Sequence, residues 1–123
     1  MNPGLRKMCD RKIAGLFLGL GIACATSAGA ADEASIEAGR LIAEDRRNGN
    51  CYSCHMVQGA ELAGNAGPPL MMMKQRYPDR DVLLAQIADP RGRNPNTIMP
   101  PYGAHGILTE QELSLVVDYL LSL

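Results

Sequence analysis

Cys51-Tyr52-Ser53-Cys54-His55 is the stretch on which the interpretation of this chain depends. It places two thiols three residues apart and an imidazole directly after the second thiol. Cys-x-x-Cys-His is the attachment motif of a c-type haem, in which both sulfurs join the porphyrin and the histidine binds the iron from one side. The motif therefore predicts one covalently bound haem c, held by Cys51 and Cys54, with His55 as an axial ligand.

The first thirty residues have the composition of a secretory leader. Four basic side chains precede an uncharged run over residues 13–25, which is short for a membrane span. Residues 28–30, Ala-Gly-Ala, then supply the small side chains that a signal peptidase requires. We therefore predict a signal peptide over residues 1–30, one domain over residues 31–123, and a periplasmic location without membrane insertion after cleavage.

Two other fates of the leader are possible. An uncleaved membrane anchor is disfavoured because the apolar run is short. A lipoprotein modified at Cys24 is disfavoured because Gly21 stands where a leucine is usual.

The cysteine count limits what else the motif can be. Once Cys9 and Cys24 leave with the leader, only Cys51 and Cys54 remain. A structural zinc site needs a second pair of soft ligands, and His105 is the one other histidine of the chain. A thioredoxin-like dithiol enzyme remains an alternative, although it requires a βαβ pattern that the flanking sequence lacks.

Composition favours a small acidic domain that contains a cofactor. Residues 31–123 carry eight Lys and Arg against twelve Asp and Glu, a formal charge of −4, and no basic run that would predict nucleic-acid binding. The domain has no Trp, and its aromatic residues are Tyr52, Tyr77, Tyr102 and Tyr119. A domain of this size is only marginally stable without a staple. A covalently bound porphyrin would supply the missing apolar bulk.

Hydrophobic periodicity predicts an all-α domain. We expect a first helix over residues 32–47 and a short helix over residues 78–88 with Val82, Leu83 and Ile87 on its buried face. Residues 56–77 and 91–106 are rich in Gly and Pro, and we expect them to be irregular.

The C-terminal helix has the clearest signature. Thr109 and Glu112 form a capping box at its start. An apolar stripe follows at helical spacing and consists of Leu113, Val116, Val117, Leu120 and Leu121. Tyr119 lies beside that stripe and is placed to reach the first helix at Gly39.

The second axial ligand of the iron is less closely determined by sequence. Met99 lies in a proline-stiffened loop, where ordering a weak thioether ligand costs little entropy. Met56 is adjacent to His55 and cannot reach the opposite face of the ring. His105 and the run Met71–Met73 remain alternatives. We favour Met99.

The proximal histidine also needs a partner that orients it. A metal-binding imidazole usually donates its second N–H to an oxygen acceptor. Pro68 offers a rigidly placed carbonyl at a suitable distance along the chain from His55, although the Gly-Pro-Pro run is equally consistent with a plain turn.

The order of these elements resembles class I cytochrome c over residues 31–123. A narrower resemblance is to the SoxX family, the monohaem subunits of the SoxAX cytochromes of bacterial sulfur oxidation. It is carried by Gly64-Asn65-Ala66-Gly67-Pro68-Pro69-Leu70, Tyr77-Pro78-Asp79-Arg80, Asn94-Pro95-Asn96-Thr97-Ile98-Met99-Pro100-Pro101-Tyr102-Gly103 and His105-Gly106-Ile107-Leu108-Thr109.

This resemblance implies a class I cytochrome c fold, Met99 as the distal ligand, Pro68 as the acceptor for the proximal histidine, and a crossing of the first and last helices at Gly39 and Tyr119. It also implies a heterodimer with a SoxA-type subunit, which joins thiosulfate to a cysteine of the SoxYZ carrier as an L-cysteine S-thiosulfotransferase. In that family the sulfur chemistry lies on the partner, and the small subunit passes electrons to a downstream acceptor. The alternative is a free-standing soluble cytochrome c.

Overall fold

The structure, a computed structural model, describes residues 31–123, so the predicted leader and its cleavage site lie outside the described residues. The helices are α1 (Glu33–Glu44), α2 (Met73–Arg76), α3 (Arg80–Ala88) and α4 (Glu110–Ser122). Two 3₁₀ turns, η1 (Cys51–Ser53) and η2 (Pro90–Gly92), interrupt the loops between them. Within residues 31–123 the extended pairing is limited to one isolated bridge, between Val57 and Leu70. The prediction of an all-α domain is confirmed.

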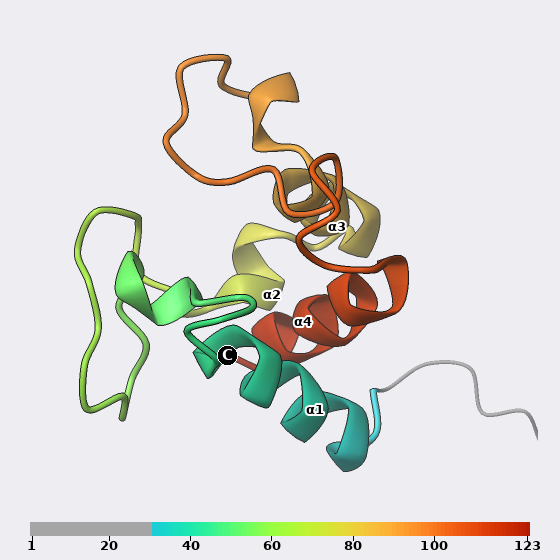
Figure 1. Cartoon of the computed structure of the whole chain (residues 1–123). Coiled ribbons are helices and arrows are strands. Elements are labelled where there is room, and N and C mark those ends of the chain that lie inside the picture. The colour runs from blue at the N-terminus through green and yellow to red at the C-terminus, as the bar shows by residue number, and fades with distance from the viewer. Residues whose placement is uncertain (1–30) are drawn as a thin grey trace, which may run out of the picture.

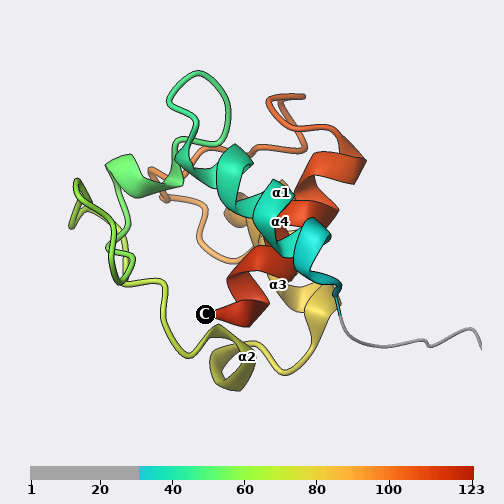
Figure 2. The ribbon, with the colours of Figure 1, turned by 90° about the horizontal axis from the view of Figure 1, so that it is seen from below.

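Helices α1 and α4 lie side by side and cross, as Figures 1 and 2 show from two directions. A Cβ atom at Gly39 would collide with the backbone carbonyl of Leu115 and would lie 2.8 Å from the Cβ of Tyr119. The absence of a side chain at Gly39 is therefore what lets the two backbones approach. The predicted crossing of Gly39 and Tyr119 is confirmed.

Helix α4 forms as its sequence predicts. The hydroxyl of Thr109 accepts from the Glu112 N–H at 3.2 Å, and the Thr109 N–H donates to the Glu112 carboxylate at 2.9 Å, which completes the capping box. The helix buries Leu113, Val116, Val117, Tyr119 and Leu120 in the core. Helix α4 packs against α1 and also contacts α2 and α3, so it is the central element of the packing.

Helix α1 begins where expected and ends earlier. Asp32 caps it by accepting from the Ser35 N–H at 2.7 Å. It ends at Glu44 rather than at residue 47, because the chain becomes extended at Asp45 and Gly49 then donates to the Ile42 carbonyl at 3.2 Å. The chain thus folds back before it enters the cysteine motif.

Two further expectations about the middle of the chain were wrong in detail. Helix α2 lies inside residues 56–77, which were expected to be irregular throughout. In α3, Leu83 and Ile87 are buried as predicted, whereas Val82 is 42% exposed. No helix in the described part of the chain combines the length and the apolar character that crossing a membrane requires.

Candidate functional site

A cavity of about 470 Å³ opens among the cysteine motif, helices α2, α3 and α4, and the loop before Tyr102. Its lining is mostly apolar and includes Leu70, Leu83, Ile87, Leu108, Val116 and Leu120. Both cysteines of the motif, His55, Pro68 and Met99 also line it. The structure therefore brings every predicted site residue to one cavity.

The cysteine motif is held by backbone hydrogen bonds on two sides. Within the turn, the N–H of His55 donates to the Cys51 carbonyl at 3.0 Å. From the following loop, Gly64 donates to Tyr52 and Gly67 donates to Cys54, both at 2.8 Å. These bonds use main-chain atoms and leave the side chains of the motif out of the framework that holds the turn; the Cys54 sulfur accepts a further bond from the Ser53 hydroxyl at 3.6 Å.

The imidazole of His55 has a defined orientation. Its Nδ1 lies 2.7 Å from the Pro68 carbonyl oxygen. A carbonyl only accepts hydrogen bonds, so Nδ1 carries the proton and Nε2 presents its lone pair. The hydrogen bond predicted between Pro68 and the histidine is present.

Gly67 is a site residue that the sequence analysis missed. A Cβ atom there would lie 2.7 Å from Nδ1 of His55 and 2.8 Å from Nε2. Only glycine lets this loop pack against the ring, which keeps the imidazole from rotating away. The sequence shows several glycines in the loop, and nothing in it singles out this one.

The methionines separate into those that line the cavity and those that do not. Met73 and Met99 line it, whereas Met56, Met71 and Met72 are exposed and lie elsewhere. The sulfur of Met73 accepts a hydrogen bond from the Arg76 guanidinium at 3.5 Å. The Met99 N–H donates to the Thr97 hydroxyl at 3.1 Å, which holds that residue within its loop.

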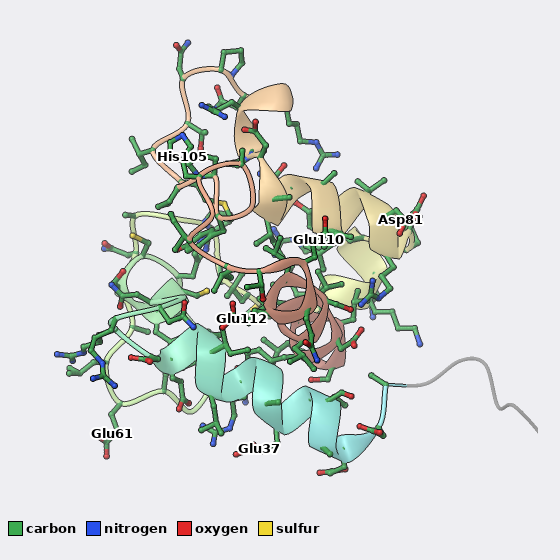
Figure 3. All side chains as sticks on the ribbon, turned by 45° about the vertical axis from the view of Figure 1, so that its right-hand side comes forward. Glu37, Glu61, Asp81, His105, Glu110 and Glu112 are labelled. Atoms are coloured by element: carbon green, nitrogen blue, oxygen red, sulfur yellow. The ribbon has the colours of Figure 1, made fainter. Side chains whose placement is uncertain are left out.

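His105 lies outside the cavity lining. It is exposed on the turn that follows the Met99 loop, and Figure 3 shows it far from Glu37 on α1. The structure therefore does not bring the second histidine to the site.

The environment of Cys51 argues against a redox dithiol. Burial raises the pKa of the Cys51 thiol to about 11. A catalytic dithiol needs a lowered pKa, because the thiolate is the nucleophile. Among residues 31–123, no three His, Cys, Asp or Glu side chains gather as the ligands of a metal ion would.

Two further cavity residues escaped the sequence analysis. The hydroxyl of Tyr102, a buried residue, donates to the Gly49 carbonyl at 2.7 Å and ties the Met99 loop to the segment before the cysteine motif. Gln86, on α3, also lines the cavity. A polar residue within a helix gives no sign in the sequence of which way it faces.

The family model of cytochrome c matches residues 36–123. The chain belongs to the cytochrome c family. It is a class I cytochrome that resembles SoxX: a chain in the crystal structure of SoxXA from P. pantotrophus superposes with a TM-score of 0.63 and 25% sequence identity, over 70% of this cytochrome and 79% of that chain.

A curated relative matches this cytochrome over only part of its own length. A protein of Aquifex aeolicus (strain VF5), described as an uncharacterized lipoprotein, is 35% identical over 75 residues. The match covers 60% of this cytochrome and 36% of the relative, so the cytochrome spans about a third of that protein.

The cavity residues fit haem c, the covalently bound cofactor of this family. The lining offers two thiols one turn apart, an imidazole whose Nε2 is free to bind a metal, and largely apolar walls. When bound, the haem supplies a one-electron Fe(III)/Fe(II) couple. The chain's own contribution is to orient the imidazole through Pro68 and Gly67, and to exclude water with the side chains of α3 and α4.

Proposed function

We propose that this cytochrome is the electron-transfer subunit of a SoxAX-type complex in thiosulfate oxidation. In that complex, an L-cysteine S-thiosulfotransferase that acts on the SoxYZ carrier, a SoxA-type partner performs the sulfur chemistry. This chain takes up the electrons and passes them to a downstream acceptor. The observation that supports the assignment best is the superposition on a SoxXA chain over 79% of its length.

Within this proposal each site residue has one role. Cys51 and Cys54 form the two thioethers, and His55 is the proximal ligand of the iron, oriented by Pro68. Met99 is the distal ligand. The other methionine in the cavity, Met73, is less suited because it lies on the short helix α2, is only 3% exposed and packs in the hydrophobic core.

This ligand set supports outer-sphere electron transfer. Two protein ligands would fill both axial positions, so no substrate needs to bind the iron. A thioether as the distal ligand favours the reduced state and raises the potential, compared with a second imidazole. The apolar walls contributed by α3 and α4 favour the same state, because burial in a medium of low dielectric constant disfavours the more highly charged centre.

The proposal is tested by its partner and by its physiology. The full chain, affinity-tagged and produced in its native host, should co-purify with a second c-type cytochrome. Deletion of the chain should abolish thiosulfate-dependent oxygen uptake, and the wild-type chain should restore it. Complementation with a Cys51→Ala/Cys54→Ala chain serves as the matched control and should fail.

The opposite result identifies the alternative. A chain that purifies alone, from cells whose thiosulfate oxidation is unaffected by the deletion, is a free-standing electron carrier. In that case the site residues keep their roles and only the assignment to sulfur metabolism is lost.

Export is part of the same proposal. A covalent c-type haem and the composition of residues 1–30 support cleavage after residue 30 and a periplasmic location. Because the Aquifex relative is described as a lipoprotein, a lipid anchor on Cys24 is the alternative. The mass of the purified protein separates the two, since a chain that begins at residue 31 lacks Cys24.

A further inference from the structure

Two consecutive prolines carry the carbonyl that orients His55. Proline has no backbone N–H, so neither Pro68 nor Pro69 can donate a hydrogen bond that anchors this part of the loop. Their carbonyls are the polar groups by which the pair is held. The Pro68 oxygen accepts from the His55 ring, and the Pro69 oxygen accepts from the Arg76 guanidinium, each at 2.7 Å. The two adjacent carbonyls therefore connect the imidazole to Arg76 through one dipeptide.

The dipeptide is stiff enough to pass a constraint from one carbonyl to the other. The peptide bond between Pro68 and Pro69 is planar, and the second ring locks the φ angle of Pro69. A single soft torsion, ψ of Pro69, therefore separates the two carbonyls, where an ordinary dipeptide has two. A donor that fixes the Pro69 oxygen thus also restricts the plane that contains the Pro68 oxygen.

Arg76 is itself held on an anchored element. It is the last residue of α2, whose first residue, Met73, is only 3% exposed. After the helix, the Tyr77 N–H donates to the Met73 carbonyl at 2.8 Å. The Arg76 guanidinium lies over the Tyr77 ring, 6.0 Å from its centroid, at the distance of a cation–π contact. The donor to Pro69 therefore extends from a fixed backbone and rests on an aromatic ring.

A second arginine beside the same ring makes a different contact. The Arg93 guanidinium lies 5.6 Å from the Tyr77 centroid, and one of its N–H groups donates to the Tyr77 hydroxyl at 3.5 Å. The bond to the Pro69 carbonyl comes from Arg76. Two arginines of equal charge thus share one aromatic neighbour, and they differ in whether they hold the proline pair.

We propose that Arg76 is a positioning residue for His55, because its bond to the Pro69 carbonyl holds the Pro68 carbonyl where the imidazole Nδ1–H can donate to it. An imidazole that donates from Nδ1 is a stronger base at Nε2, and a stronger base stabilises oxidised iron. Arg76 thus acts on the iron site through two carbonyls. It contributes to the orientation of the ring and to the reduction potential.

This inference rests on the proposed role of His55 as an iron ligand and does not depend on the assignment to sulfur oxidation, so the haem-loaded protein alone suffices for the test. The direct readout is the exchange of the His55 Nδ1 proton with solvent, followed by NMR in the reduced state. Arg76→Gln removes the donor to Pro69. Arg93→Gln is the matched control, which removes the same charge from beside the same ring. Pro69→Ala keeps every charge and unlocks the joint between the two carbonyls.

We expect the proton to exchange faster in Arg76→Gln, by up to about tenfold, the factor that corresponds to one ordinary hydrogen bond. Exchange in Arg93→Gln should keep the wild-type rate. Pro69→Ala should also exchange faster, and its reduction potential should be higher than that of the wild type, because a weakened Nδ1 hydrogen bond makes the imidazole a poorer ligand for oxidised iron.

An Arg76→Gln protein that exchanges at the wild-type rate would overturn the inference and leave Arg76 with an effect of charge alone. If Arg76→Gln does not take up haem, a Pro69→Ala protein with the wild-type exchange rate and potential overturns it equally. A wild-type protein whose His55 ring protons lack the NMR shift caused by the haem ring current would overturn the ligand assignment as well.

Discussion

At the scale of single residues, the site is defined by what surrounds the imidazole of His55. The Pro68 carbonyl fixes which nitrogen carries the proton, and Gly67 supports the ring from a distance that no side chain permits. A one-residue change at either position would act on the proposed iron ligand without touching the metal. Sites built in this way lose affinity or activity by roughly 10–100-fold when such supporting residues are changed.

The two methionines of the cavity provide a direct test of the distal ligand. We expect Met99→Leu to abolish the sulfur-to-iron band and to lower the reduction potential, because the thioether is lost at nearly unchanged volume. Met73→Leu is the matched control and should retain the band, since this residue is only 3% exposed and serves in packing. Absorption spectra of the two oxidised variants decide the matter. The reverse pattern would make Met73 the ligand.

At the scale of elements, the crossing of α1 and α4 depends on a single missing side chain. Helix propensity alone predicts that Gly39→Ala stabilises α1 by about 1 kcal/mol. The collision with the Leu115 carbonyl opposes this gain, and forcing extra atoms into a packed contact costs roughly 1–3 kcal/mol. We therefore expect a lower free energy of unfolding for Gly39→Ala, measured by urea titration of the haem-loaded protein.

The control for this substitution is Gly92→Ala, where an added Cβ meets no atom within 4 Å. This variant should unfold at the wild-type urea concentration or slightly above it. A Gly39→Ala protein that is more stable than the wild type would show that the two backbones have room to separate.

The same elements show how far sequence alone leads. The capping box and apolar stripe of α4 are local signals, and they predict that helix correctly. Helix α2 is only four residues long and begins after Met72, a non-glycine residue with a positive φ of 53°, so no propensity rule would find it. Val82 has the apolar character of a buried residue, yet tertiary packing leaves it exposed.

The residues of the candidate site also differ in how well the sequence predicts them. Cys51, Cys54, His55, Pro68 and Met99 were found because their chemistry is tied to a motif or a stiff loop. The role of Gly67 was not found, because it depends on the distance between its loop and the His55 ring. The spacing of residues along the sequence predicts covalent attachment well and predicts side-chain packing poorly.

At the scale of the whole molecule, the cavity lies against the hydrophobic core and shares Leu83, Val116 and Leu120 with it. A domain of this size buries only roughly two-thirds of the surface of its unfolded chain. Here the walls of the cavity are mostly apolar and are built on the same residues as the core. The porphyrin is therefore expected to be as much a structural as a redox component.

Removal of both attachment residues tests this dependence. We expect Cys51→Ala/Cys54→Ala to lose its cooperative urea transition and much of its far-ultraviolet circular dichroism, because the cavity walls are then exposed to water. Ser53→Ala, in the same turn, keeps both thiols and should behave as the wild type. A double variant that unfolds cooperatively at the wild-type midpoint would mean that the polypeptide core suffices by itself.

The close approach of Gly39 to the Leu115 carbonyl joins a segment that would cross the membrane early during export to one that would cross it late. The stretch Cys51–His55 emerges between them, so it stays accessible for as long as α4 is missing. We expect the attachment machinery to act during this interval, and proteases to compete for the same unprotected chain. Translation that stops short of α4 would then yield a pigmented but short-lived fragment.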